Sequence, residues 1–429
     1  GGITTLVCLI AVPGIMASEN WDDHDRSGRY TSHDLAYDYL NSCAPDAILF
    51  TNGDNDTFPL WYIQEVEGVR TDVRVINLSY LGADWYISQM QRKAYDSDPA
   101  PFDLPESKYR QGTRDMAYLI DRIKGPVNLK QAMQFYFSDN PQTKRLPNYR
   151  EKVDYIPTKT FMLPVDSSLI MNTKTIRPAL AGEMVDTMEW SINKNYIAKN
   201  EIMVLQLLAN NNWKRPVYYA ITVSRDNYLD LDRYFQIQGL AYRIVPIKAD
   251  NSDGQTGTID TKIMYDNMIN KFKWGNIQDP KVYLDENNLR MLTNFRNNFS
   301  RLAEALINEG KKDSARIVLD ECLRLMPNDR VPYNFFNLSM IQSYYRLNET
   351  EKANDMAKTL AFVTNDELRY YISLDTEVAK TFDYETRLDI HILQEIIRLT
   401  GEYGQTDLKN KLNEEFQDKV MMLTTKNRR

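Results

Sequence analysis

The sequence predicts an α/β domain with a Rossmann-like mixed or parallel sheet, followed by an all-α domain of tetratricopeptide-like repeats. Three observations support this fold class. An apolar run at 47–51 leads into an acidic turn and a helix, and a second strand is predicted at 72–79, which is the pattern of a βαβ unit. Strand and helix patterns alternate through most of the chain up to residue 250. From about residue 289 onward the pattern is continuously helical.

The composition is that of a folded, acidic protein. The chain has 429 residues, enough for about two or three domains, and 43% of them are hydrophobic and 26% charged. A net charge of −7 without a basic stripe argues against nucleic acid as a partner. The 27 tyrosines and 6 tryptophans suit a surface that recognises other molecules. The three cysteines lie far apart and form neither a disulfide framework nor a zinc pattern.

Residues 1–17 carry no charged side chain and are predicted to be the end of a transmembrane helix that starts before this chain. A helix needs about 20 residues to span a bilayer, and a secretory signal would begin with basic residues. A buried core helix is the alternative interpretation. The flank that follows is acidic at Glu19 and across 22–25, which indicates that it does not face the cytoplasm.

The next elements follow from local patterns. Residues 20–29 are predicted to be a polar loop, and a helix is expected from Thr31 or Ser32 to about Cys43. After the strand at 47–51, a glycine permits a sharp turn, and Thr57 is the expected N-cap of the next helix.

Later elements are predicted from periodicity and from turn residues. Helices are expected at 83–90, 201–210 and 228–238, and strands at 216–223 and 241–247. A polar loop rich in Gly, Ser and Asp begins at residue 250 and suggests an internal boundary. The predicted organisation is an extracytoplasmic α/β domain at 18–250, a linker with the first helices at 251–288, and a helical domain at 289–429.

One window of about 34 residues in the helical domain matches the tetratricopeptide pattern. Apolar and small residues line two helices on either side of a turn at Gly310, and Pro327 ends the second helix. Looser copies follow at 344–360 and 392–416. One window alone would fit an ordinary helical hairpin, but tandem copies favour a repeat stack. Such stacks usually bind a peptide or protein on a concave surface.

The first candidate site is the acidic turn after the first strand, formed by Asp54, Asn55 and Asp56. Ligands of open α/β sheets bind outside the carboxyl ends of the strands. Carboxylate oxygens suit Mg²⁺, Mn²⁺ or Ca²⁺, so a divalent cation is the cofactor that this turn would hold. The alternative is that both carboxylates cap the helix at Phe58 and interact with its dipole.

Two further groups complete the candidates. The cluster Asp22, Asp23, His24 and Asp25 would join the acidic turn in a composite site if the helix at 31–43 packed against the first strand; the alternative is a solvated loop next to the membrane. With 3 histidines in the chain, a multi-histidine metal site is not expected. Lys214 and Arg215 precede a strand and are candidate contacts for phosphate or carboxylate, unless they are only a solvated strand entrance.

Several segments together resemble one family. They are Asn20-Trp-Asp-Asp-His-Asp-Arg-Ser27, Asn52-Gly-Asp-Asn-Asp-Thr-Phe-Pro-Leu-Trp61, Gln64-Glu-Val-Glu-Gly68 with Arg70, Asp72-Val-Arg-Val75, Trp213-Lys-Arg-Pro-Val-Tyr218 and Gly239-Leu-Ala-Tyr-Arg243. In these segments the chain resembles the soluble C-terminal portion of bacterial multi-spanning membrane proteins of glycosyltransferase family 117. Those proteins are of the GT-C type and are related to protein O-mannosyltransferases. The resemblance covers most of residues 18–250.

The resemblance implies a location and a role. GT-C enzymes carry their catalytic acidic residue in an early extracytoplasmic loop of the membrane part and use a lipid-phosphate sugar donor, so no catalytic residue is carried over to this chain. The chain would lie on the periplasmic side of the bacterial inner membrane, attached through its N-terminal helix. It would bind the acceptor protein or peptide through its helical repeats and serve protein O-glycosylation, with mannose as the expected sugar.

Two other functions stay open on the sequence. One is a metal-dependent sugar- or phosphate-binding α/β domain that uses Asp54 and Asp56. The other is a non-enzymatic envelope scaffold that binds proteins through its helical repeats.

Overall fold

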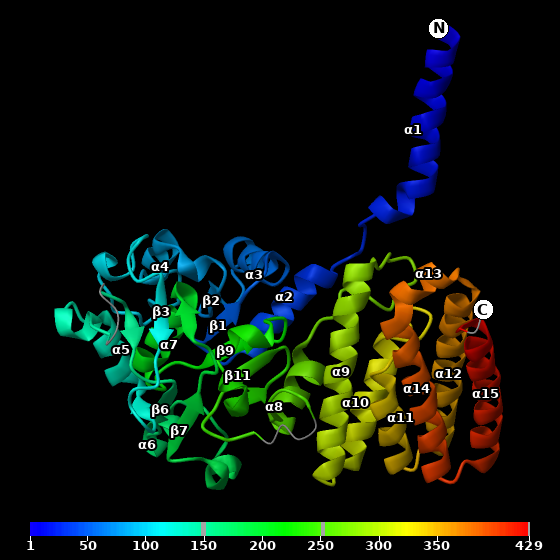
Figure 1. The fold of residues 1–429 in the computed structure, drawn as a ribbon. Helices are drawn as coiled ribbons and strands as arrows, with labels where there is room; N and C mark the ends of the chain where they lie inside the picture. The colour runs from blue at the N-terminus through cyan, green and yellow to red at the C-terminus, as the bar shows by residue number, and fades with distance from the viewer. Residues whose placement is uncertain (147–151, 250–253, 428–429) are drawn as a thin grey trace. The chain divides into compact units, whose positions relative to one another are not determined.

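The computed structural model describes residues 1–146, 152–249 and 254–427. The chain forms two compact units, one from residues 32–273 and one from residues 1–31 together with 274–429 (Figure 1). The first unit is built on a mixed β-sheet and the second is helical. The predicted fold class, α/β followed by all-α, is therefore confirmed.

The main sheet has six strands in the order β12-β10-β11-β9-β1-β2. Its centre is β1 (Ile48–Thr51), which pairs in parallel with β2 (Arg74–Asn77) on one side and with β9 (Val217–Ala220) on the other. All residues of these three strands are buried, which explains why β1 and β9 are mainly apolar or aromatic. The sheet is completed by antiparallel β11 (Ala241–Ile244) and β10 (Phe235–Ile237) and by β12 (Thr258–Ile259), which is parallel to β10.

Helices and two smaller three-stranded sheets surround this sheet (Figure 1). The helices are α2 (Thr31–Ser42), α3 (Asp54–Glu67), α4 (Asp84–Met90), α5 (Leu129–Phe137), α6 (Ser167–Asn172), α7 (Lys199–Asn211) and α8 (Thr261–Tyr265). The small sheets have the orders β5-β3-β8 and β4-β6-β7, with β3 (Met116–Leu119), β4 (Val127–Asn128), β5 (Tyr155–Ile156), β6 (Thr160–Pro164), β7 (Thr187–Ser191) and β8 (Tyr196–Ala198). The predicted helices at 83–90 and 201–210 are thus present as α4 and α7.

The predicted helix at 228–238 is wrong. Leu231–Tyr234 forms a short 3-10 turn, and β10 begins directly after it. Strands β10 and β11 form a hairpin in which Gly239 has a φ of +115°, and a Cβ at this position would lie 2.6 Å from the Ser42 hydroxyl oxygen. Aromatic side chains that pack on one another, including Tyr228 and Phe235 at a centroid distance of 4.9 Å, favour the strand arrangement over helical periodicity.

The N-terminal helix α1 (Gly2–His24) is longer than predicted. Its segment Gly2–Trp21 is exposed and is long and apolar enough to cross a membrane, a test that a signal sequence would also pass. The loop predicted from residue 20 is wrong at its start, because the helix continues to His24.

The helical unit consists mainly of three successive helical hairpins, and neighbouring hairpins contact each other through α9 with α11 and α12 with α14. The pairs are α9 (Glu286–Asn308) with α10 (Lys312–Leu325), α11 (Asn337–Arg346) with α12 (Thr350–Ser373), and α14 (Asp383–Glu402) with α15 (Thr406–Asn427); the short α13 (Thr376–Ala379) precedes the last pair. The small and apolar side chains of the 34-residue window, such as Ala303 and Ala315, are buried where α9 meets α10.

Asp389 carries a carboxyl group that is buried in the helical unit, and one of its two oxygens accepts no hydrogen bond from the described residues. Asp389 on α14 is 5% exposed, and its Oδ2 has no partner among the described residues. Burial, reinforced by repulsion from Glu367 and Glu385, raises the pKa of Asp389 to about 7.

Substituting Asp389→Asn should therefore stabilise the protein, and more so at neutral pH than in acid. The folded protein keeps this proton up to about pH 7, whereas the unfolded chain releases it near the ordinary aspartate pKa of 3.8. The wild-type unfolding free energy therefore falls as the pH rises between these values. We expect a gain of roughly 2–4 kcal/mol at pH 8 and a small gain near pH 4 in urea denaturation followed by circular dichroism. Glu414→Gln, an exposed carboxylate on α15, is the matched control. A pH-independent difference would contradict this assignment.

Candidate functional site: an aromatic groove next to the acidic turn

The acidic turn begins where β1 ends. Helix α3 starts at Asp54, earlier than predicted, with Gly53 at the N-cap position. The predicted N-cap Thr57 therefore lies inside the helix. Its hydroxyl group is 2.7 Å from that of Thr51 and accepts a hydrogen bond from the Asn77 amide at 2.9 Å, so it joins α3 to β1 and β2.

Asp56 is the structural centre of this turn. Its Oδ1 accepts the backbone N–H of Gly53 at 2.9 Å, and its Oδ2 accepts the hydroxyl of Thr222 at 2.6 Å. Thr222 in turn accepts the Tyr39 hydroxyl at 3.3 Å. Asp56 is 5% exposed, so this buried carboxylate closes the first turn of α3 and connects it to the segment after β9.

Asp54 and Asn55, the other two residues of the acidic turn, form no part of this hydrogen-bond network among the described residues. Asp54 and Asn55 are exposed, and Asp54 accepts a hydrogen bond from the Tyr80 hydroxyl at 3.3 Å. His24 and Asp25 belong to the other compact unit, where Asp25 accepts the backbone N–H of Ser27. The side chains of Asp22 and Asp23 lie outside the described residues.

Among the described side chains, no group of three or more His, Cys, Asp or Glu residues is arranged to hold a metal ion. The divalent cation at the acidic turn stays a prediction.

Lys214 and Arg215 have different surroundings. The Arg215 guanidinium donates hydrogen bonds to the backbone carbonyls of Asp46 at 2.8 Å, Asp98 at 3.0 Å and Pro99 at 3.3 Å. Lys214 is exposed and lines a cavity at the amino ends of β1 and β9.

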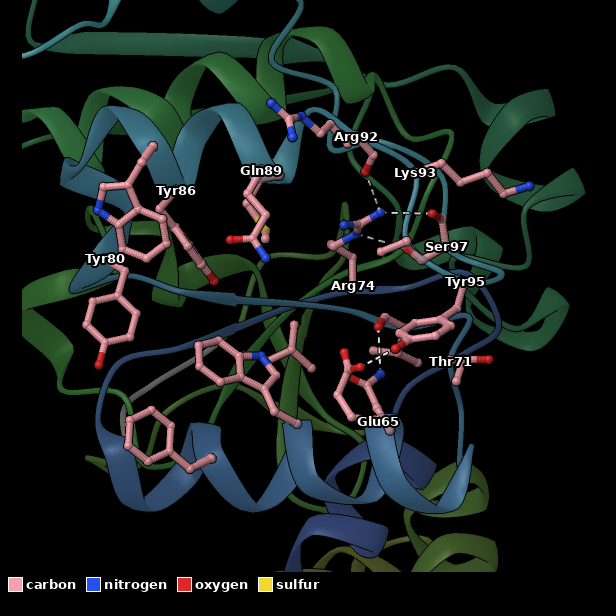
Figure 2. Close-up of a pocket in the computed structure, with 18 residues that line it drawn as sticks. Glu65, Thr71, Arg74, Tyr80, Tyr86, Gln89, Arg92, Lys93, Tyr95 and Ser97 are labelled. Atoms are coloured by element: carbon pink, nitrogen blue, oxygen red, sulfur yellow. Dashed lines mark hydrogen bonds between the residues drawn. The ribbon is translucent and has the colours of Figure 1, made fainter.

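A groove of about 740 Å³, which the sequence did not predict, lies between α3 and α4, with β2 as its floor (Figure 2). We call it the aromatic groove, because aromatic side chains from both helices, from the 3-10 turn Tyr80–Gly82 before α4 and from the loop after α4 form its walls. These side chains are Phe58, Trp61, Tyr80, Trp85, Tyr86 and Tyr95. The acidic turn adjoins it through Asp54, which contacts Tyr80.

Four of these rings form a continuous row. The ring centroids are 5.6 Å apart between Phe58 and Trp61, 6.3 Å between Trp61 and Tyr80, and 6.3 Å between Tyr80 and Trp85. Phe58 is 46% exposed and Trp85 59% exposed, which is unusual for large apolar side chains on a folded surface. The row therefore offers apolar ring surface to a ligand.

Polar groups lie around the aromatic row. The hydroxyl of Tyr95 donates to Glu65 at one end of the groove, and Gln89, Arg92 and Lys93 lie on the α4 side (Figure 2). Convergent polar groups at the border of an apolar concavity are typical of ligand sites, where they fix orientation.

Arg74 forms part of the floor and holds the groove's outer loop. It is 4% exposed, and its Nη2 donates to the backbone carbonyls of Arg92 at 3.0 Å, Ser97 at 2.8 Å and Asp98 at 3.0 Å. Burial, followed by repulsion from Arg215, lowers the pKa of Arg74 to about 10. The side chain still carries its positive charge at neutral pH, and the carbonyl dipoles compensate that charge.

The free edge of β2 is closed by side chains. The Gln64 amide donates to the carbonyl of Val73 at 2.8 Å, and the Asn77 backbone N–H donates to the Tyr86 hydroxyl at 2.9 Å. Native proteins protect edge strands in this way. A ligand in the groove would thus contact side chains rather than extend the sheet.

The family model TMEM260-associated domain 2 matches residues 32–263, more than half of the chain. The chain belongs to this family. No curated protein and no solved structure matches the chain. The matched TMEM260-associated domain contains the acidic turn, the aromatic groove, Lys214 and Arg215, whereas the helical hairpins from residue 286 onward lie beyond it.

The bonds of Asp56 predict a structural role that can be measured. Asp56→Ala should lower the unfolding free energy by about 1–3 kcal/mol, because it removes the buried carboxylate that accepts hydrogen bonds from the Gly53 backbone N–H and the Thr222 hydroxyl. Asn55→Ala, an exposed substitution in the same turn, should change it by less than about 0.5 kcal/mol. Urea denaturation of both variants tests this, and equal stabilities would mean that the network contributes nothing.

Proposed function

We propose that this chain is the periplasmic accessory region of a bacterial inner-membrane protein O-glycosyltransferase and that it binds the acceptor polypeptide. Membership of the TMEM260-associated domain 2 family supports a link to glycosyltransferases, and the apolar α1 supports attachment to a membrane. In this proposal the transferase chemistry, mannosyl transfer from a lipid-phosphate sugar, belongs to a membrane part outside this chain. The chain itself binds and orients the acceptor.

The exposed ring row of the aromatic groove is the observation that carries this proposal. Rigid aromatic side chains give large apolar contact at a low cost in conformational entropy, and Trp, Tyr and Arg dominate the binding energy of protein interfaces. The groove's volume of about 740 Å³ suits a few side chains of a bound segment. Arg92, Lys93 and Asp54 supply charges of both signs at its borders.

The helical hairpins are proposed as a second contact for the acceptor. Several large apolar side chains on α12 and α14 are exposed, such as Phe362 at 72% and Tyr384 at 69%. Stacked helical hairpins commonly bind polypeptides. Two separate contacts on one acceptor would raise the overall affinity without requiring either contact to be strong.

The groove's role can be tested in the native host. A strain that carries Trp61→Ala with Trp85→Ala should lose most glycan occupancy on its envelope glycoproteins, measured by quantitative glycopeptide mass spectrometry. Each aromatic contact is worth about 2 kcal/mol or more at a binding hot spot, so the loss of both should weaken acceptor binding by about 1,000-fold.

Tyr62→Ala is the matched control, because Tyr62 is exposed on the same helix and does not line the groove. It should leave occupancy at the wild-type level. Unchanged occupancy in the double variant, at equal protein abundance, would remove the groove from the proposed function. A second strain without residues 289–429 tests the helical contact, and equal occupancy there would remove that contact.

Two alternative functions stay as proposals and have their own tests. Calorimetry with Mg²⁺, Mn²⁺ and Ca²⁺ tests a metal-dependent sugar or phosphate site at Asp54 and Asp56, and no heat with any of the three would reject it. Deletion of the whole gene tests an envelope scaffold. If glycan occupancy were unaffected by that deletion, the scaffold would be favoured over the transferase.

A further inference from the structure

A second cavity of about 580 Å³ lies in the α/β unit at the amino ends of β1 and β9. Its wall includes the end of α2, the turn before β1, the residues before β9, and Arg243 on β11. We call it the Arg243 cavity. It shares no lining residue with the aromatic groove.

Arg243 is a buried cation with unused donors. It lies opposite Tyr218 in the β11–β9 pairing, and its guanidinium is 5.6 Å from the centroid of the Tyr218 ring. It is 2% exposed, and its Nε and Nη2 find no hydrogen-bond partner within the described part of the chain. Leaving buried donors of a charged group unpaired is costly, and such groups in native proteins call for an explanation.

Three other arginines of the α/β unit donate to backbone carbonyls. Arg70 donates to the backbone carbonyls of Leu40 at 2.7 Å and Cys43 at 3.0 Å and pairs with Asp72 at 2.8 Å. Arg74 and Arg215 likewise bind backbone carbonyls. The guanidinium groups of these three arginines thus have hydrogen-bond acceptors within the fold. Arg243, which lines a cavity, has two donors without an acceptor among the described residues.

The remaining charges of the cavity wall are mainly positive. Lys174 and Lys214 are exposed and form no ion pair with the described residues, whereas Lys271 pairs with Asp266 at 2.7 Å. Asp46 is the one acidic residue among the described lining residues. The cavity therefore combines a buried guanidinium with two free ammonium groups at its border.

We propose that the Arg243 cavity binds the phosphate group of a small organic phosphate. The Nε and Nη2 donors of a guanidinium form a fork that matches two oxygens of one phosphate. The two lysines would balance the second negative charge. The cavity is much larger than a phosphate ion and falls within the size range of small-molecule sites, so it has room for an organic group attached to the phosphate.

Calorimetry on the full chain in detergent micelles tests this with three probes, namely orthophosphate, ribose 5-phosphate and succinate. Ribose 5-phosphate should bind more tightly than orthophosphate, and succinate should not compete. If orthophosphate binds equally well, the ligand is free phosphate and not an organic phosphate, and the assignment of a phosphate site is supported. Binding of succinate in preference to both phosphates, or no binding of any probe, would overturn the proposal.

Variants connect the binding to these residues. Arg243→Met should abolish binding, and Lys174→Gln with Lys214→Gln should weaken it by about 10- to 100-fold, with Lys130→Gln on α5 as an exposed control that keeps wild-type affinity. Because Arg243→Met removes an unpaired buried charge, its melting temperature without ligand should not fall. If this variant does not fold, the double lysine variant decides the result.

Trp61→Ala should bind ribose 5-phosphate normally, which separates a failure of this site from a failure of the groove. Unchanged affinity in the double lysine variant would overturn the assignment of the cavity.

Discussion

Three arginines that bind backbone carbonyls hold together the segments around the amino end of the central strand. Arg70 donates to carbonyls at and just after the end of α2, between 40 and 44. Arg215 donates to the carbonyls of Asp46 before β1 and of 98–99, and Arg74 donates to carbonyls between 92 and 98. Charge-assisted hydrogen bonds are about twice as strong as neutral ones, and here they replace regular secondary structure. The loop that forms the outer wall of the aromatic groove has little secondary structure of its own, so its position depends on these bonds.

The sequence was sufficient to predict the strand, the turn and the helix around the acidic residues, because each has a local cause. A continuous apolar run, a glycine and a carboxylate three residues later are all visible in one short segment. The role of Asp56 was not predictable in the same way. Its second oxygen is bound by Thr222, which reaches it only because β9 pairs with β1, and that pairing is a property of the tertiary fold.

The aromatic groove and the hairpin at β10 escaped prediction for related reasons. Phe58 and Trp61 are three residues apart on one helix, which is a local signal, but their neighbours Tyr80 and Trp85 come from beyond the next strand. The residues between 228 and 238 also fit a helical period, and their packing in the tertiary structure decides against a helix there. Arg243 did leave a signal in the sequence, since a charged residue within a buried strand must either find a partner or serve a ligand.

The short segment 70–75 borders both cavities, with Arg70 on the Arg243 cavity and Thr71, Val73 and Arg74 on the aromatic groove. Its position is fixed on both sides. Moving it would break the bond of Arg70 to the Leu40 carbonyl of α2 and those of Arg74 to its loop, and each such charge-assisted bond contributes about 1.5–3 kcal/mol. A wall held in this way is already in place before a ligand arrives, which lowers the ordering cost of binding. The carbonyl-binding arginines thus explain why two cavities can persist side by side on a sheet whose own strands are only a few residues long.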